Sequence, residues 1–172
     1  EAVDVVLGPE VAGIVAHESA GHPGEADRIL GREAAQAGES YLKPGDLGVK
    51  IGSDQAYVSD DPTIPHSMGF YLYDDEGLPA RKRRLMEAGV ISEFLQNRAT
   101  AREFSLSSNA ASRSVAFNRE PIIRMANTFV EPGDYSFEEL IEDVTLGVYI
   151  KSFMEWNIDD KRLNERYVGL EA

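Results

Sequence analysis

The sequence contains no cysteine among its 172 residues. This absence excludes a disulfide framework and leaves no thiolate ligand for a metal within the chain. Long apolar runs are also missing. No stretch approaches the roughly 20 apolar residues needed to span a bilayer, and no secretory signal is recognisable. We therefore expect a cytoplasmic protein with no membrane partner.

Basic residues are scarce relative to acidic ones. Seventeen Lys and Arg stand against thirty Asp and Glu, which gives a net charge of -13 and a pI near 4.6. Nonspecific binding to DNA or to anionic membranes needs clustered Lys and Arg, so this composition argues against a nucleic-acid partner. The one basic run, residues 81–84, has acidic stretches on either side and is predicted to be a solvated strand or turn face.

The length and composition fit one domain. A chain of 172 residues can bury a substantial core, and 42% hydrophobic residues is ordinary for a globular protein. The chain starts without Met at a strand-like segment, residues 3–7, and stops within an alternating apolar pattern at residues 166–172. Strands normally end in turn residues. We therefore interpret residues 1–172 as a single domain that is part of a longer protein truncated at both ends.

The local patterns predict an α+β fold: a mostly antiparallel sheet, a motif-bearing helix near the N-terminus and a few short helices. Gly8-Pro9 is expected to open the first helix, with Pro at the first helical position. A second helix is expected at about residues 25–37, a third at about residues 100–104, and a fourth behind a capping box formed by Ser136 and Glu139.

Short β-branched and aromatic runs predict the strands. A hairpin is expected over residues 85–91, with its turn at Ala88-Gly89. A second hairpin is expected to close the chain, with its turn at residues 159–161. The other predicted strands are residues 49–51, 56–58, 70–73 and 121–130.

The residues with the clearest chemical meaning form the sequence His-Glu-Ser-Ala-Gly-His at residues 17–22. Neutral imidazole is a good zinc ligand. Glu18, beside the first histidine, can take a proton from zinc-bound water, whose pKa the ion lowers to about 7. His17 and His22 are therefore candidate metal ligands, and Glu18 is the candidate general base of an HExxxH-type metallopeptidase.

The spacing of the two histidines requires a distortion of the helix. In the familiar H-E-x-x-H helix the histidines are four residues apart and share one face. Here they are five apart, which on a regular helix leaves them about 140° apart. A π-type turn would bring them back toward one face. Alternatively, the helix ends at Gly21 and His22 leaves helical geometry, because Pro23 disfavours the α region for the residue before it.

A structural explanation of the same residues remains open. Two exposed histidines near a helix end, with Glu18 paired to an arginine, would account for the motif without a metal. The remaining histidine, His66, lies in a loop-like segment and is more typical of a loop histidine than of a third ligand. Glu25 and Asp27 could ligate or orient a ligand, although acids at the start of a helix commonly serve the helix dipole.

Three segments together resemble a known family. Residues 17–27 resemble the signature of the TldD/PmbA family, historically described as modulators of DNA gyrase and regarded as metalloproteases. Residues 74–77 followed by 87–90 resemble the central hairpins of that family, and residues 124–128 followed by Pro132-Gly133 resemble its Arg-Met-x-Asn-Thr strand and turn. The match covers nearly the whole chain in order.

The resemblance implies a zinc peptidase of the TldD type, in which His17 and His22 bind zinc and Glu18 is the base. In the family the third ligand is a cysteine far toward the C-terminus. This chain has no cysteine, so its site is expected to be incomplete and the piece alone to be inactive. Pro23 stands where some members have Gly. Members usually act as pairs, so a homo- or hetero-oligomer with a PmbA/TldE-like subunit is expected.

The family implies a substrate as well. Its members degrade or trim unfolded peptides held in an extended form, and strand addition suits such substrates because it reads backbone more than side chains. Arg113, Arg124 and Asn127 are candidates for contacts to peptide or transition state. The alternative is a non-catalytic module that binds a peptide or a partner, such as a regulator of gyrase.

Overall fold

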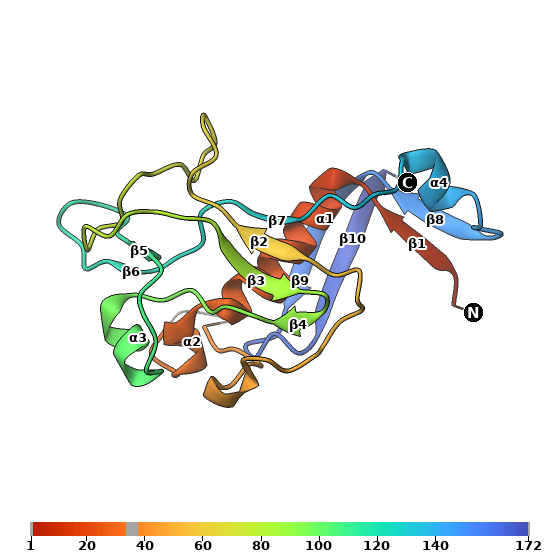
Figure 1. Cartoon of the computed structure of the whole chain (residues 1–172). Coiled ribbons are helices and arrows are strands. Elements are labelled where there is room, and N and C mark those ends of the chain that lie inside the picture. The colour runs from red at the N-terminus through yellow and green to blue at the C-terminus, as the bar shows by residue number, and fades with distance from the viewer. Residues whose placement is uncertain (1, 34–37, 172) are drawn as a thin grey trace.

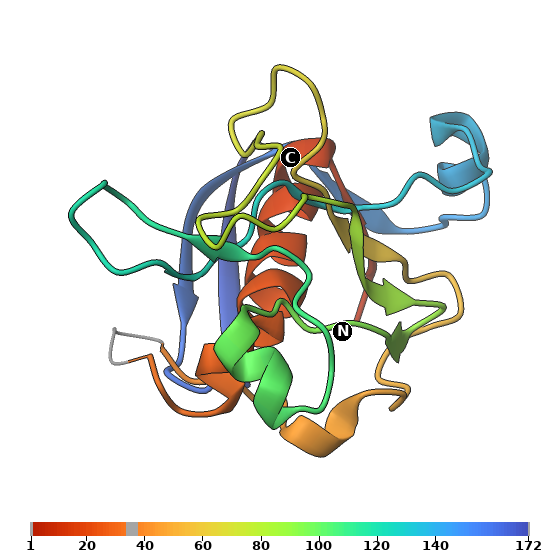
Figure 2. The same ribbon diagram turned by 60° about the vertical axis from the view of Figure 1, so that its left-hand side comes forward.

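The computed structural model describes residues 2–33 and 38–171 of the chain. Short helices and strands, joined by long loops, surround the helix α1, Pro9–Ala16 (Figures 1 and 2). Within these ranges the strands form four small sheets, and all pairs except β1–β8 are antiparallel. The predicted α+β class with a mostly antiparallel arrangement is confirmed.

Helix α1 begins as the sequence predicted. Gly8 is extended at the N-cap, and Pro9 occupies the first turn, where its missing N–H leaves no hydrogen bond unmade. Val11 and Ala16 are buried, and the helix contacts β7 (Thr128–Val130) and β9 (Ser152–Ile158). The segment that follows Ala16 therefore starts from a packed helix, and its Glu18 and Gly21 are buried.

The largest sheet has the order β4-β3-β2-β7. Strand β3 (Arg83–Glu87) pairs with β2 (Val58–Asp60) and with β4 (Val90–Ile91), and β2 also pairs with β7. Ala88 and Gly89 link β3 to β4 with φ values of 50° and 75°. Two consecutive positive φ angles are typical of a type I′ hairpin turn, so this hairpin prediction is confirmed.

The chain ends in a second, longer hairpin made of β9 and β10 (Glu165–Glu171). The predicted capping box precedes α4 (Phe137–Ile141): the Glu139 backbone N–H donates to the Ser136 hydroxyl, and the Glu139 carboxylate accepts from the Ser136 N–H. The remaining strands and α-helices are β1 (Asp4–Leu7), which runs parallel to β8 (Gly147–Ile150), the pair β5 (Ser112–Arg113) and β6 (Ile122–Ile123), α2 (Ala26–Ile29) and α3 (Arg98–Glu103). A 3-10 turn, η3, covers Pro44–Asp46.

The second helix was predicted too long. Instead of running from about residue 25 to 37, α2 covers only Ala26–Ile29 and is followed by Gly31 at a φ of 67°. Glycine enters this left-handed region without steric cost, and it ends many helices in this way. Residues 34–37 lie outside the described part of the chain.

Several strand predictions were also wrong. Residues 49–51 and 70–73 form isolated bridges, Lys50 with Val90 and Tyr73 with Pro79, rather than strands. The predicted strand at 121–130 splits into β6 and β7, because the Ala126 N–H donates to the Asp60 carboxylate at 2.8 Å and not to a strand partner.

The basic run is not uniformly solvated. Arg83 is fully buried, forms an ion pair with Asp60, and donates to the Tyr71 hydroxyl and to two backbone carbonyls. Burial lowers its pKa, but the charges of Asp60 and Tyr71 and the hydrogen bonds to both residues together outweigh burial and raise the pKa overall. A guanidinium has five donors, and here a carboxylate and carbonyls surround it, which makes burial tolerable. The other three basic side chains are partly exposed and pair with Glu93, Glu131 and Glu87.

Nine buried apolar residues of the described chain, between positions 26 and 125, form the core cluster: Ala26, Leu42, Leu85, Ile91, Phe94, Leu95, Ala111, Ile123 and Met125. Met125 of this cluster lies against Gly21, so the histidine motif packs directly on the core. Among the described residues, no helix is both long and apolar enough to cross a membrane.

Candidate metal centre

The histidine motif occupies a π-helical turn. The segment η1, His17–Gly21, continues α1 with π geometry, and the His22 N–H donates to the His17 carbonyl, an i to i+5 hydrogen bond. The extra residue per turn turns the two histidines toward each other, as the first of the two alternatives required. The second alternative was wrong: His22 keeps helical angles, φ −59° and ψ −43°, although Pro23 follows it in the 3-10 turn η2, His22–Gly24.

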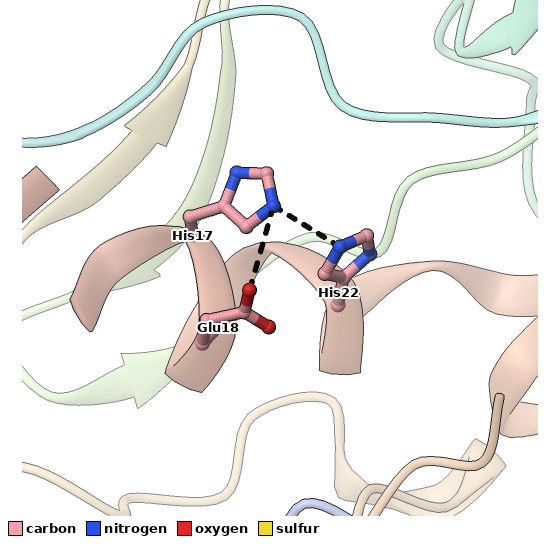
Figure 3. Close-up of side chains that lie close together, drawn as sticks. All are labelled: His17, Glu18 and His22. Carbon is pink, nitrogen blue, oxygen red and sulfur yellow. Dashed lines mark hydrogen bonds and ion pairs between the residues drawn. The ribbon is translucent and has the colours of Figure 1, made fainter. Parts of the chain in front are cut away.

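The two imidazoles face each other with their Nε2 atoms 3.1 Å apart and their rings nearly perpendicular (Figure 3). Two nitrogens of one tetrahedral zinc shell, each 2.0–2.1 Å from the ion, lie about 3.3 Å apart. The observed separation therefore fits a pair of zinc ligands with little movement. Within the described chain, His17, Glu18 and His22 are the three metal-ligating side chains whose donor atoms gather within 4.8 Å.

The two histidines differ in their environment. The His17 side chain is 44% exposed, whereas that of His22 is 17% exposed. Burial and the neighbouring His22 imidazole hold the pKa of His17 below its usual 6.5, against an opposing influence of Glu18. Neutral imidazole is the form that binds metal, so this shift favours ligation.

Glu25 contacts the ring nitrogen of His22 that faces away from His17. The His22 Nδ1 lies 2.9 Å from Glu25 Oε2, and Glu25 is fully buried. Burial raises the pKa of Glu25, but the His22 hydrogen bond and the charges of Arg28 and Arg124 together outweigh it and lower the pKa. Of the two acids that the sequence offered for binding or orienting a ligand, Glu25 is the one that contacts a histidine of the motif. Asp27 instead accepts backbone N–H groups of Arg28 and Ile123.

Glu18 lies against the histidine pair, with Oε1 3.8 Å from His17 Nε2 (Figure 3). Two residues of the C-terminal hairpin hold its carboxylate. The Trp156 indole N–H donates to Oε1 at 3.1 Å, and the Arg162 guanidinium forms a buried ion pair with Oε2. An arginine therefore does pair with Glu18, as the metal-free explanation of the motif expected. The pairing occurs together with the converging histidines rather than in place of them.

Gly21 makes room for the turn. A Cβ atom at this position would lie 1.9 Å from the Met125 sulfur, well inside contact distance. Met125 belongs to the core and is 7% exposed. The absence of a side chain at Gly21 therefore lets η1 pack directly against Met125 of the core.

The three predicted substrate contacts lie in different surroundings. Arg124 is 3.7 Å from Glu25 and 3.0 Å from Glu33, so it borders the histidine site. The Arg113 guanidinium donates to the Met125 carbonyl and lies over the Tyr71 ring. Asn127 binds the loop at residues 61–69, where its amide group donates to the Asp61 carbonyl and the Ser67 hydroxyl and accepts from the Gly69 N–H.

Sequence reasoning missed two residues of the site. Trp156 and Arg162 lie 138 and 144 residues from Glu18 along the chain, so no local pattern connects them. A tryptophan has one side-chain donor, its indole N–H, but the sequence does not say which acceptor it reaches. His66 is exposed, has a φ of 65°, and does not belong to the cluster.

The sequence of the chain matches a known protein family. Residues 1–166 match the family described as the PmbA/TldA metallopeptidase C-terminal domain. A metalloprotease of Methanocaldococcus jannaschii is 38% identical over 168 residues, 98% of this chain and 36% of the relative. A zinc metalloprotease TldD homolog of Saccharolobus solfataricus is 34% identical, over 86% of this chain and 32% of the relative. The chain thus spans about a third of these relatives.

Solved structures share the fold. The crystal structure of a candidate modulator of a DNA gyrase from Thermotoga maritima superposes with a TM-score of 0.71 at 27% identity, covering 88% of this chain and 32% of the other. TldE from Thermococcus kodakarensis gives a TM-score of 0.71 at 20% identity, over 97% of this chain and 38% of its own; this likeness shows the fold alone. On the sequence match over residues 1–166, the chain belongs to the PmbA/TldD family of metallopeptidases.

Proposed function

We propose that this chain carries the zinc-binding and proton-transferring residues of a TldD-type peptidase that cleaves unfolded or extended peptides. The observation that carries the proposal is the pair of Nε2 atoms 3.1 Å apart, a separation that suits one tetrahedral ion. Supporting it, one similar protein is named a zinc metalloprotease TldD homolog. The two histidines supply two ligands, and the family resemblance points to a cysteine outside this chain as the third.

A bound zinc ion would supply Lewis acidity, which acidifies water and polarises a carbonyl oxygen. The chain supplies the proton transfer. Glu18 Oε1 is close enough to the histidine pair to accept a proton from water there and then to pass it to the leaving amine. Trp156 and Arg162 hold the carboxylate in place, so the proton is exchanged at a fixed position.

Arg124 is our first choice among the substrate contacts, because it borders the site through Glu25. Arg113 and Asn127 already bind backbone and loop groups, so we propose that they shape the surface on which an extended peptide lies. We expect the complete protein to work with a PmbA/TldE-like subunit. One structural neighbour bears the name TldE.

One observation favours the non-catalytic alternative. Arg162 and Trp156 already engage both oxygens of Glu18, as would suit a structural carboxylate in a peptide-binding module. The two functions differ in their dependence on Glu18. A base is indispensable to hydrolysis, whereas a binding module tolerates its neutral analogue.

Glu18→Gln in the longest form of the protein separates the two functions. Removing a general base costs about 10²- to 10⁴-fold in rate. We therefore expect hydrolysis of an unstructured peptide to fall by that factor while zinc content is kept. Glu10→Gln, an exposed acid in the first turn of α1, is the matched control and should retain full activity. Unchanged peptide binding with no hydrolysis in either the native protein or the variant would establish the binding module instead.

A further inference from the structure

Backbone hydrogen bonds on either side of Glu25 fix its main chain, independently of its side chain. It has extended angles, φ −71° and ψ 114°, between η2 and α2. A parallel bridge to Leu95 fixes this conformation: the Leu95 N–H donates to the Gly24 carbonyl at 2.8 Å, and the Ala26 N–H donates to the Leu95 carbonyl at 3.1 Å. The carboxylate therefore projects from a rigid position in the core.

The contacts of the side chain converge on one oxygen. Glu25 Oε2 accepts from His22 Nδ1 at 2.9 Å and from the Arg28 guanidinium, and Arg124 lies 3.7 Å away. The other oxygen, Oε1, is buried and makes no hydrogen bond among the described residues. A buried acceptor without a partner is unfavourable. Hydrogen bonding of the carboxylate alone therefore does not explain why Glu25 is placed here.

The contact with Glu25 determines which ring nitrogen of His22 carries the proton. A carboxylate flanked by two guanidinium groups only accepts hydrogen bonds, so Nδ1 of His22 must be the donor. A neutral imidazole carries one proton, which leaves the Nε2 lone pair free. That atom is the one 3.1 Å from His17 Nε2.

We infer that Glu25 is a positioning residue that selects the Nδ1–H tautomer of His22 and holds its Nε2 ready to bind a divalent metal. A hydrogen bond from the second ring nitrogen to a carboxylate commonly fixes the tautomer and ring orientation of a metal-binding histidine. The inference rests on the proposed function for the identity of the ligand. The tautomer itself does not depend on metal.

A purely structural Glu25 is the competing explanation. As a buried partner of Arg28 it would stabilise the start of α2 without any effect on the imidazole. Asp27 offers the matched comparison, because it is also buried and binds the backbone N–H groups of Arg28 and Ile123. Asp27→Asn should destabilise the same region without altering the proton of His22.

The test is long-range ¹H–¹⁵N NMR of the histidines in this chain, with zinc affinity measured by chelator competition in the longest form of the protein carrying the same substitutions. We expect His22 to carry its proton on Nδ1 in the native chain and in Asp27→Asn. In Glu25→Gln we expect a mixture of tautomers and zinc affinity lowered about 10- to 100-fold, the usual effect of losing such a partner. Affinity in Asp27→Asn should stay within about threefold of the native value.

A proton on Nε2 of His22 in the native chain would overturn the inference, and this result needs no variant to fold. Zinc affinity unchanged in folded Glu25→Gln would also overturn it, while leaving the proposed function standing. If the longest form of the native protein binds no zinc, the proposed function fails. The tautomer measurement then still decides whether Glu25 orients His22.

Discussion

At the scale of single residues, His22 shows how the site accommodates an unfavourable position. The residue before a proline normally avoids the α region, yet His22 has φ −59° and ψ −43°. Two interactions offset this cost: the i to i+5 hydrogen bond to the His17 carbonyl and the contact of its ring with Glu25. The pairing of the histidines therefore depends on these two interactions, which keep His22 in helical geometry directly before a proline.

The lowered pKa of His17 predicts a pH dependence of the metal-free chain. Its folded-state pKa lies below the unfolded value of 6.5, so between the two values the unfolded chain binds more protons. Stability from this group is therefore fully present above pH 6.5 and is lost as the pH falls toward the folded-state pKa. Because the side chain is 44% exposed, the effect on stability should be small, and the titration itself is the better observable.

An NMR titration of the His17 imidazole checks this expectation. Its midpoint should lie below 6.5 in the native chain and move upward in His22→Ala, which removes the neighbouring imidazole that helps to lower the pKa. A midpoint above 6.5 in the native chain would contradict the described environment of His17.

At the scale of elements, the π-turn depends on a glycine that touches the core. Gly21→Ala would place a Cβ 1.9 Å from the Met125 sulfur, although the backbone angles of Gly21 suit alanine. Overpacking of this kind costs about 1–3 kcal/mol. Denaturant titration should show that loss, and Met125→Ala in the same chain should recover part of it because the two changes share one site.

Gly13→Ala is the control for this prediction. Gly13 lies inside α1, with nothing within 4 Å of an added Cβ, so the substitution should stabilise the chain by about 0.5–1 kcal/mol. Equal effects of the two substitutions would mean that helix propensity, and not the contact with Met125, governs Gly21.

Elements were predictable where the signal is local. The first helix, the Ala88-Gly89 hairpin and the Ser136 capping box each rest on residues within one turn of each other, and each was confirmed. The second helix and the strand at 121–130 were mispredicted, because Gly31 and the contact between Ala126 and Asp60 ended them. The first signal was visible in the sequence, whereas the second required the tertiary fold.

At the scale of the whole molecule, the site joins the two ends of the chain. Glu18 comes from the segment after α1, and its partner Arg162 comes from the turn between β9 and β10. The histidine motif could be found from the sequence because its residues are adjacent. The partners of Glu18 could not, because burial and long-range packing alone select one arginine among many.

The ion pair between Glu18 and Arg162 is nearly solvent-free, with side-chain exposures of 7% and 5%. Arg162→Met would leave a buried carboxylate with no cation, a loss of about 3–5 kcal/mol. We expect a correspondingly lower midpoint in urea denaturation. Arg166→Met, an exposed position on β10, should change stability by less than about 0.5 kcal/mol. Similar effects of the two substitutions would contradict the assigned role of Arg162.

The central claim is that His17 and His22 bind one zinc ion together, and zinc stoichiometry with affinity measures this most directly. We would titrate zinc into the native protein, in this chain and in its longest form, and into His17→Ala, His22→Ala and His66→Asn. His66 is the matched control, because it lies in a loop outside the cluster and asparagine tolerates its positive φ. The account predicts one zinc per molecule of the longest form and weaker binding to this chain, which has no cysteine to act as the third ligand. In the longest form, affinity should be at least about 100-fold weaker in each alanine variant and unchanged in His66→Asn. Equal binding in all four proteins, or no binding to the longest form at micromolar zinc, would contradict it.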